Sequence, residues 1–177
     1  VDTIGLMRKF VLDVRQSTNK EWGLDHLMIH ATHNHEGPDT QGLWGPGLFE
    51  SGVNQDYMRE LKRSILSVIE TAISNLEPAE MSIARIATDP RTPIKDKRKP
   101  IVIDEDIRAL LFRRPDQSVI GTVVNFGIHV ELAWDKNLLL PSDLAGFLRR
   151  GNSEGIYYDE EVLMPGLGGT SLWLTGN

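Results

Sequence analysis

The sequence predicts an α/β fold with a mixed sheet flanked by helices. Segments with helical periodicity alternate with strand-like segments along the 177 residues, and no segment repeats another. Hydrophobic residues make up 40% of the chain and charged residues 25%, values typical of globular proteins. This length is enough for one domain with a substantial core, so we expect residues 1–177 to form a single domain.

The first part of the chain predicts one helix, one strand and a long loop. Met7, Phe10 and Val14 follow helical spacing, and this helix should end near residues 17–19. Leu27–His33 is short, apolar and flanked by polar residues, which predicts a buried strand. The following segment, 34–52, is rich in Gly and Pro and lacks periodicity, so we expect a long loop able to carry functional groups.

The clearest predicted helix covers residues 54–76. Asn54 suits its N-cap, Asp56 suits its first turn, and Pro78 lies just past its end. Its apolar side chains form one stripe: Tyr57, Met58, Leu61, Ile65, Val68, Ile69, Ala72 and Ile73.

The second half of the chain predicts most of the strands. Met81–Thr88 alternates as a strand does, and Asp89–Pro100 is a charged, Pro-rich segment typical of a solvated loop. Ile107–Arg113 and Ser118–His129 are separated by a turn-like segment, 114–117, which predicts a hairpin.

A short helix and a last strand are expected near the end of the chain. Ser142–Arg150 suits a helix with Ser142 as its N-cap, and Ser171–Thr175 suits the strand. Asp143 could accept a hydrogen bond behind a functional site, but a first-turn helix charge is the interpretation that the sequence favours.

Composition excludes several classes of function. The net charge is −6 and the basic residues are dispersed, apart from Lys95–Lys99, so we expect no nucleic-acid partner. The absence of cysteine excludes disulfides, thiolate metal sites and cysteine nucleophiles. No apolar run approaches the roughly 20 residues of a transmembrane segment. Because the chain begins with Val1, we expect an internal stretch of a longer protein.

The segment around His33 and His35 is the first candidate site. Residues i and i+2 of an extended chain point to the same side, so both imidazoles could aim at one metal ion. Glu36 and Asp39 are nearby acceptors or bases. His30 should face the other way and serve a structural role. The alternative is that these are loop histidines satisfied by backbone hydrogen bonds.

His129 is the second candidate position, at the predicted end of the long strand. Ligands in α/β proteins commonly bind at the carboxyl ends of strands. A catalytic zinc normally takes three protein ligands and keeps one position for water, so His129 is a candidate third ligand. The alternative is a satisfied core histidine.

Three segments, in order, resemble motifs of the neutral, non-lysosomal ceramidases. Residues 31–38, Ala-Thr-His-Asn-His-Glu-Gly-Pro, resemble the Thr-His-Thr-His-Ser-Gly-Pro segment of that family. Residues 124–129 look like the second histidine strand, and residues 141–147 resemble the Ser-Ala-Asp-Phe-Pro-Gly-Tyr stretch. Residues 171–177 are similar to the start of the next motif, so the resemblance spans nearly the whole chain.

The resemblance implies a zinc amidase that cleaves the N-acyl bond of ceramide. His33 and His129 would then be zinc ligands, and His35 a neighbouring active-site residue. The family completes its site with a glutamate and a tyrosine far downstream, and its serine motif would begin after Asn177. The chain is therefore expected to be an incomplete part of a larger catalytic domain. Family precedent also implies a secreted or periplasmic protein.

Two departures from the family motif bear on the substrate. Asn34 and Glu36 replace small hydroxyl residues beside the expected metal position, so the substrate could differ from ceramide. A lipid would need an apolar groove. Leu43, Trp44, Leu48 and Phe49 could line one, or could instead pack under their own loop.

The leading hypothesis is therefore a zinc-dependent amidohydrolase acting on ceramide or a related lipid amide, with His35 and Glu36 as proton carriers. One alternative is an inactive structural or binding module on the same fold. Another is a different metal-dependent hydrolase, such as a peptidase or phosphoesterase. The sequence leaves the oligomeric state open.

Overall fold

The computed structural model describes residues 1–88, 94, 96–132 and 137–176. They form two compact units, Val1–Glu77 and Pro78–Asn177. Each unit is a group of residues with many contacts among themselves. Whether residues 1–177 form a single domain stays a prediction. None of the helices in the described part of the chain combines the length and apolarity that a membrane crossing needs.

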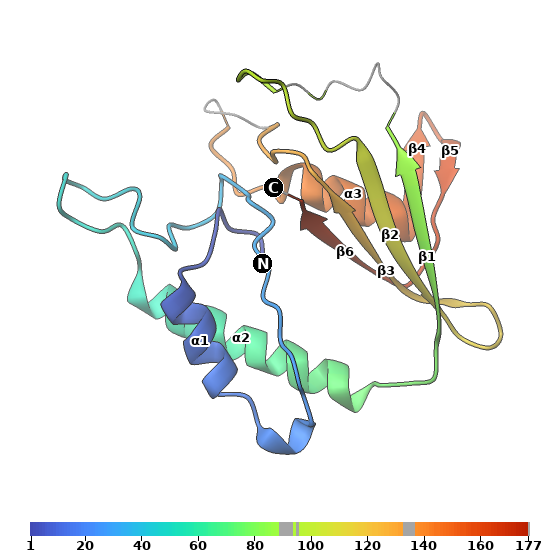
Figure 1. Cartoon of the computed structure of the whole chain (residues 1–177), viewed down its shortest axis with the longest axis horizontal. Coiled ribbons are helices and arrows are strands. Elements are labelled where there is room, and N and C mark those ends of the chain that lie inside the picture. The colour runs from blue at the N-terminus through green and yellow to red at the C-terminus, as the bar shows by residue number, and fades with distance from the viewer. Residues whose placement is uncertain (89–93, 95, 133–136, 177) are drawn as a thin grey trace. The chain divides into compact units, whose positions relative to one another are not determined.

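The first unit contains two α-helices, α1 (Arg8–Gln16) and α2 (Gln55–Ser74), and one 3₁₀ turn, η1 (Lys20–Trp22) (Figure 1). Both predicted helices are confirmed. The Asn54 side chain caps α2 by accepting hydrogen bonds from the backbone N–H groups of Asp56 (2.9 Å) and Tyr57 (3.1 Å), as predicted.

The segment 27–33 is not a regular strand, so that prediction is wrong. It runs beside the start of the chain and exchanges a few backbone hydrogen bonds with it. Val1 N donates to His30 O (2.9 Å), Thr32 N donates to Val1 O (2.9 Å), and Asn34 N donates to Thr3 O (3.1 Å). A strand needs a continuous ladder with a neighbour, and these bonds are too few to form one.

The second unit is built on a four-stranded sheet in the order β1-β2-β3-β6. Its strands are β1 (Glu80–Ala87), β2 (Asp106–Arg113), β3 (Val119–Phe126) and β6 (Thr170–Thr175). The first two pairings are antiparallel and β6 is parallel to β3, so the predicted mixed sheet and its β2–β3 hairpin are confirmed.

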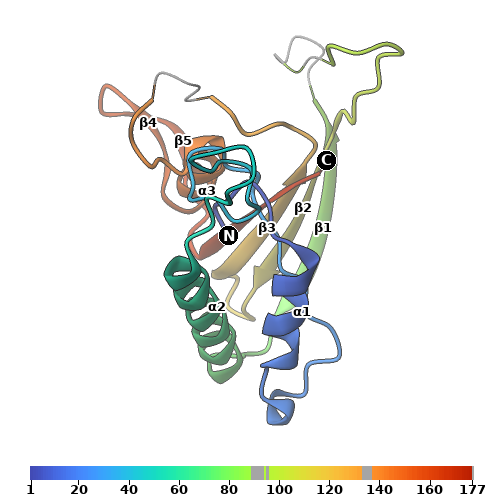
Figure 2. The same ribbon diagram turned by 90° about the vertical axis from the view of Figure 1, so that its left-hand side faces the viewer.

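The crossover from β3 to β6 carries a helix, α3 (Asp143–Glu154), and a hairpin of β4 (Gly155–Tyr158) and β5 (Glu161–Pro165). Figures 1 and 2 show α3 lying across one face of the sheet near β6, with the hairpin following it. The core between helix and sheet comprises Phe126, Val130, Ala145 and Trp173.

The β4–β5 hairpin was not predicted, because its turn residues, Asp159 and Glu160, adopt positive φ values (47° and 65°) without the Gly that usually follows Asn or Asp in such a turn. Ser142 precedes α3, but its side chain makes no capping hydrogen bond. In the predicted loop 89–100, residues 89–93 and 95 lie outside the described residues, and the remainder has no regular structure.

Candidate metal centre

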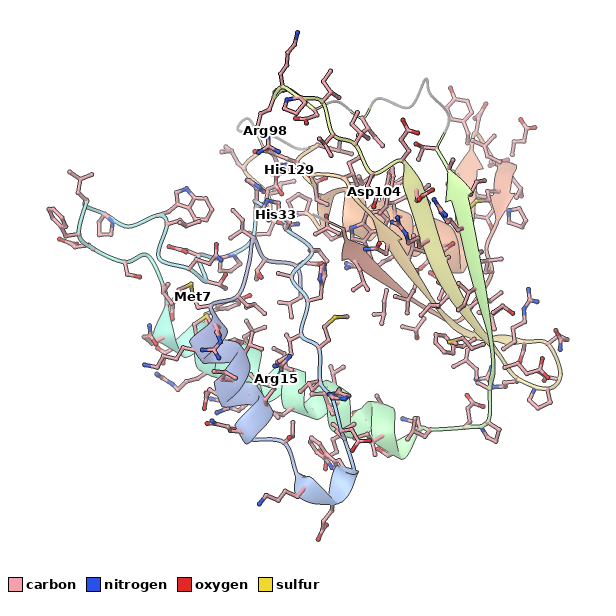
Figure 3. All side chains as sticks on the ribbon, viewed as in Figure 1. Met7, Arg15, His33, Arg98, Asp104 and His129 are labelled. Atoms are coloured by element: carbon pink, nitrogen blue, oxygen red, sulfur yellow. The ribbon has the colours of Figure 1, made fainter. Side chains whose placement is uncertain are left out.

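His33 lies at a left-handed bend and not on an extended strand. Its φ is 65°, a conformation that His, Asn and Asp adopt more readily than most residues. Its Nδ1 lies 2.8 Å from the carbonyl oxygen of Ile4 (Figure 3 labels His33). Because a carbonyl oxygen only accepts, Nδ1 must carry the proton, and the lone pair of neutral His33 lies on Nε2.

The rings of His33 and His35 contact each other edge to face, with centroids 4.9 Å apart and planes at 85°. The structure therefore brings these two side chains together, although the expected reason, an extended chain, is wrong. His35 Nε2 and Glu36 Oε2 are both shielded from solvent.

Asn34 shapes the bend between the two histidines. Its side chain is buried, and its Oδ1 accepts a hydrogen bond from the Glu36 backbone N–H at 2.8 Å. This is an Asx turn, in which a side-chain oxygen takes the place of a backbone carbonyl. Thr32 is also buried and donates to Asp2 Oδ1 at 3.0 Å. The histidines are thus held by buried polar contacts.

Asp39 organises the loop that follows. Its carboxylate accepts hydrogen bonds from four successive backbone N–H groups, those of Gln41, Gly42, Leu43 and Trp44, at 2.7–3.2 Å. Desolvation acts to raise the pKa of Asp39, but these four donors outweigh it and hold the pKa below its ordinary value. Asp39, expected as an imidazole acceptor or base, is committed to the loop backbone in this structure.

The same loop exposes its large apolar side chains. Leu48 is 98% exposed and Phe49 is fully exposed, while Leu43 and Trp44 are about half exposed. Leu48 and Phe49 are therefore not packed under the loop, and Leu43 and Trp44 are covered only in part.

His129 lies in the second unit, in the loop after β3. The expectation that it ends a strand is wrong, because β3 stops at Phe126. His129 Nδ1 lies 3.4 Å from Glu131 Oε2. This carboxylate, two residues along the chain, was not singled out from the sequence, although the His-x-Glu spacing is visible there.

Asp143 anchors the loop that carries His129. Its Oδ2 accepts a hydrogen bond from the Leu132 backbone N–H at 2.8 Å. Asp143 also lies in the first turn of α3, so the interpretation that the sequence favoured, a first-turn helix charge, is confirmed, and this hydrogen bond is an additional contact. On the other side, Thr175 donates to the Ile128 carbonyl at 2.8 Å, so β6 also holds the loop.

The fold is that of part of the neutral ceramidases. The crystal structure of neutral ceramidase from Pseudomonas aeruginosa matches 97% of this chain with a TM-score of 0.70 and 15% identity. A structure of ceramidase complexed with C2 matches 97% with a TM-score of 0.73 and 18% identity. The chain spans only 29% and 28% of those two structures. No protein-family model and no curated protein sequence matches it.

Proposed function

We propose that this chain is part of a zinc-dependent amidohydrolase that cleaves the N-acyl bond of ceramide or a related lipid amide. The observation that carries the proposal is the paired rings of His33 and His35, within a segment that resembles the ceramidase histidine motif. The likeness to ceramidase structures supports it, because that likeness extends over 97% of the chain and so includes both units.

The donor set suits zinc. His33, His35 and His129 each offer an imidazole nitrogen, and imidazole is a common zinc ligand. In the proposal, His33 and His129 bind the ion through Nε2. Further ligands would come from the rest of a longer protein.

The chain's own contacts would orient both proposed ligands. The Ile4 carbonyl accepts the Nδ1 proton of His33, and the Glu131 carboxylate lies beside Nδ1 of His129. An oxygen acceptor behind a ligand histidine fixes its tautomer and makes the ligating nitrogen more basic. When bound, zinc would supply Lewis acidity, polarising the amide carbonyl and lowering the pKa of water.

His35 and Glu36 are the proposed proton carriers. Cleaving an amide requires removing a proton from the attacking water and delivering one to the leaving nitrogen. An imidazole and a carboxylate can do both, and the edge contact places the His35 ring beside the proposed ligand His33. The Asn34 turn fixes the backbone of Glu36, the residue that follows His35.

The exposed loop supports a lipid substrate. Residues 40–49 carry no charge, and Leu48 and Phe49 are almost entirely exposed. An uncharged apolar loop can contact acyl chains without desolvating an ionised group. A secreted or periplasmic location is part of the same proposal and is supported by the family resemblance alone.

The test is the metal content of the full-length protein, measured by mass spectrometry, for the wild type and for His33→Ala, His129→Ala and His26→Ala. We expect about one zinc per chain, lost in the first two variants and kept in the third, whose histidine is exposed and lies outside the motif at residues 31–38. Zinc-dependent hydrolysis of ceramide or a lipid amide should follow the same pattern. A folded protein that binds no metal after incubation with zinc would refute the proposal and favour the inactive module.

A further inference from the structure

The loop that follows the histidine segment ends in a turn with two large apolar side chains at its tip. The Glu50 backbone N–H donates to the Gly47 carbonyl at 3.1 Å, and this bond closes a turn whose central residues are Leu48 and Phe49. Central turn positions are usually taken by Gly, Pro, Asn, Asp or Ser, which suit a bent backbone. Leu48 is 98% exposed and Phe49 fully exposed, so the described residues leave both side chains uncovered.

The base of this turn is narrow and braced. Gly45 lies against the carbonyl oxygen of Glu50, and Gly52 lies against that of Trp44, so closely that a Cβ atom on either glycine would overlap the oxygen. The Asp39 carboxylate braces one side of the loop through its four backbone hydrogen bonds. Figure 1 shows the loop extending away from α1 and α2 of the same unit. The tip therefore stands on a pre-formed support, and binding through it would cost little ordering entropy.

The chemistry of the tip favours a lipid bilayer over a protein partner. Residues 40–49 carry no charge, so the tip can enter hydrocarbon without desolvating an ionised group. The indole of Trp44 is the one hydrogen-bonding side chain of residues 43–49, whereas protein interfaces surround their apolar anchors with polar groups that bond across the contact. Trp44 is also about half exposed, and tryptophan is enriched at the boundary between headgroups and acyl chains.

We infer that the turn 47–50 docks the protein on the surface of a phospholipid bilayer. The side chains of Leu48 and Phe49 enter the outer acyl region, while the turn backbone and Trp44 stay at the level of the headgroups, where polar backbone groups keep their partners. The inference rests on the proposed function in one respect, that a lipid-amide hydrolase must reach a substrate held in a membrane. Its test involves neither metal nor hydrolysis, so the two can fail separately.

The experiment measures, by sedimentation, how the full-length protein partitions onto phosphatidylcholine vesicles that contain no ceramide, with a chelator keeping the protein free of metal. Leu48→Ser with Phe49→Ser should lower the partition coefficient at least roughly tenfold, because two large apolar side chains leave the hydrocarbon. Val68→Ser with Leu76→Ser, the matched control, replaces two other exposed apolar residues of the first unit and should bind as the wild type does. Because the tip carries no charge, high salt should not weaken binding.

Two further measurements separate a bilayer from a partner of fixed shape. Leu48→Phe with Phe49→Leu exchanges the side chains and keeps the apolar area, so the swapped protein should bind within about twofold of the wild type. Phosphatidylcholine brominated near the headgroup should quench part of the tryptophan fluorescence of bound protein, and Trp44→Phe should remove that quenching. No binding of the wild type, equal binding of the double Ser variant, loss of binding in the swapped protein or in high salt, or bound protein without Trp44 quenching would each overturn the inference.

Discussion

Asp39→Ala should release the backbone of residues 40–44. In the folded chain Asp39 Oδ1 accepts from the N–H groups of Gln41 (2.9 Å), Gly42 (2.7 Å) and Leu43 (3.2 Å), and Oδ2 accepts from Trp44 (3.0 Å). The alanine variant removes all four acceptor contacts at once.

The magnitude follows from the number and setting of these bonds. A helix-capping side chain, which accepts one or two such bonds, contributes about 0.5–2 kcal/mol. The Asp39 carboxylate accepts four, but it lies near the surface, so we expect Asp39→Ala to cost about 2 kcal/mol of local stability. Asp39→Asn keeps one acceptor oxygen and loses the bond from Trp44, since an amide nitrogen cannot accept. Its cost should be about 1 kcal/mol.

Hydrogen exchange of the individual amides measures these costs. At about 1.4 kcal/mol per factor of ten, residues 41–44 should exchange roughly 30-fold faster in Asp39→Ala and about fivefold faster in Asp39→Asn. The first-turn amides of α2, capped by Asn54, provide the internal control and should not change. Equal exchange in all three proteins, or an Asn variant as fast as the Ala variant, would refute the reasoning.

The same loop should respond to acid. Because the folded-state pKa of Asp39 is lowered, the carboxylate contributes its full stabilisation above the ordinary value of 3.8. That stabilisation is lost as the pH falls from there through the lowered pKa. Protection of residues 41–44, expressed relative to Asp39→Asn, should hold from neutral pH down to that range and then disappear.

Three further predictions concern the capping residue, the residue behind His129 and the exposed loop. Asn54→Ala should lower the free energy of unfolding by about 1 kcal/mol in urea titrations, because it removes the N-cap of α2; an unchanged midpoint would contradict this. Glu131→Gln should weaken zinc binding by the full-length protein about tenfold to a hundredfold in a chelator competition, since the carboxylate beside His129 Nδ1 is lost; wild-type affinity would remove Glu131 from the site. Replacing Leu48 and Phe49 together with Ser should slow hydrolysis of a lipid amide in phosphatidylcholine vesicles but not of a soluble short-chain amide, whereas Leu76→Ser, also an exposed leucine of the first unit, should affect neither.

The elements that the sequence predicted correctly are those whose signals are local. Helix α2 carries its own cap, first-turn charge and apolar stripe, so Asn54 marks its start without reference to other parts of the chain. The β2–β3 hairpin is similarly specified by two strand-like segments and a short turn. The prediction of a strand at residues 27–33 failed because a strand depends on hydrogen bonds to a neighbouring segment. The apolar composition of residues 27–33 does not reveal how few such bonds the start of the chain supplies.

The site was only partly predictable for the same reason. The sequence singled out His33, His35 and His129 as candidates, since imidazoles at these spacings are visible in one dimension, and their role in a metal site stays a proposal. It could not show that Asn34 bends the chain between the first two, because the Asx turn depends on a buried side-chain contact. Nor could it show that Asp39 serves the loop backbone, or that Glu131 lies beside His129.

The left-handed backbone of His33 restricts what evolution can place there. Gly, Asn and Asp tolerate this conformation, whereas Val, Ile and Thr would strain the bend on which His35 and Glu36 depend. A lineage without the proposed metal chemistry that kept the loop would therefore have only a few residue types at position 33. Gly or Asn at this position would identify relatives that kept the architecture and lost the proposed ligand.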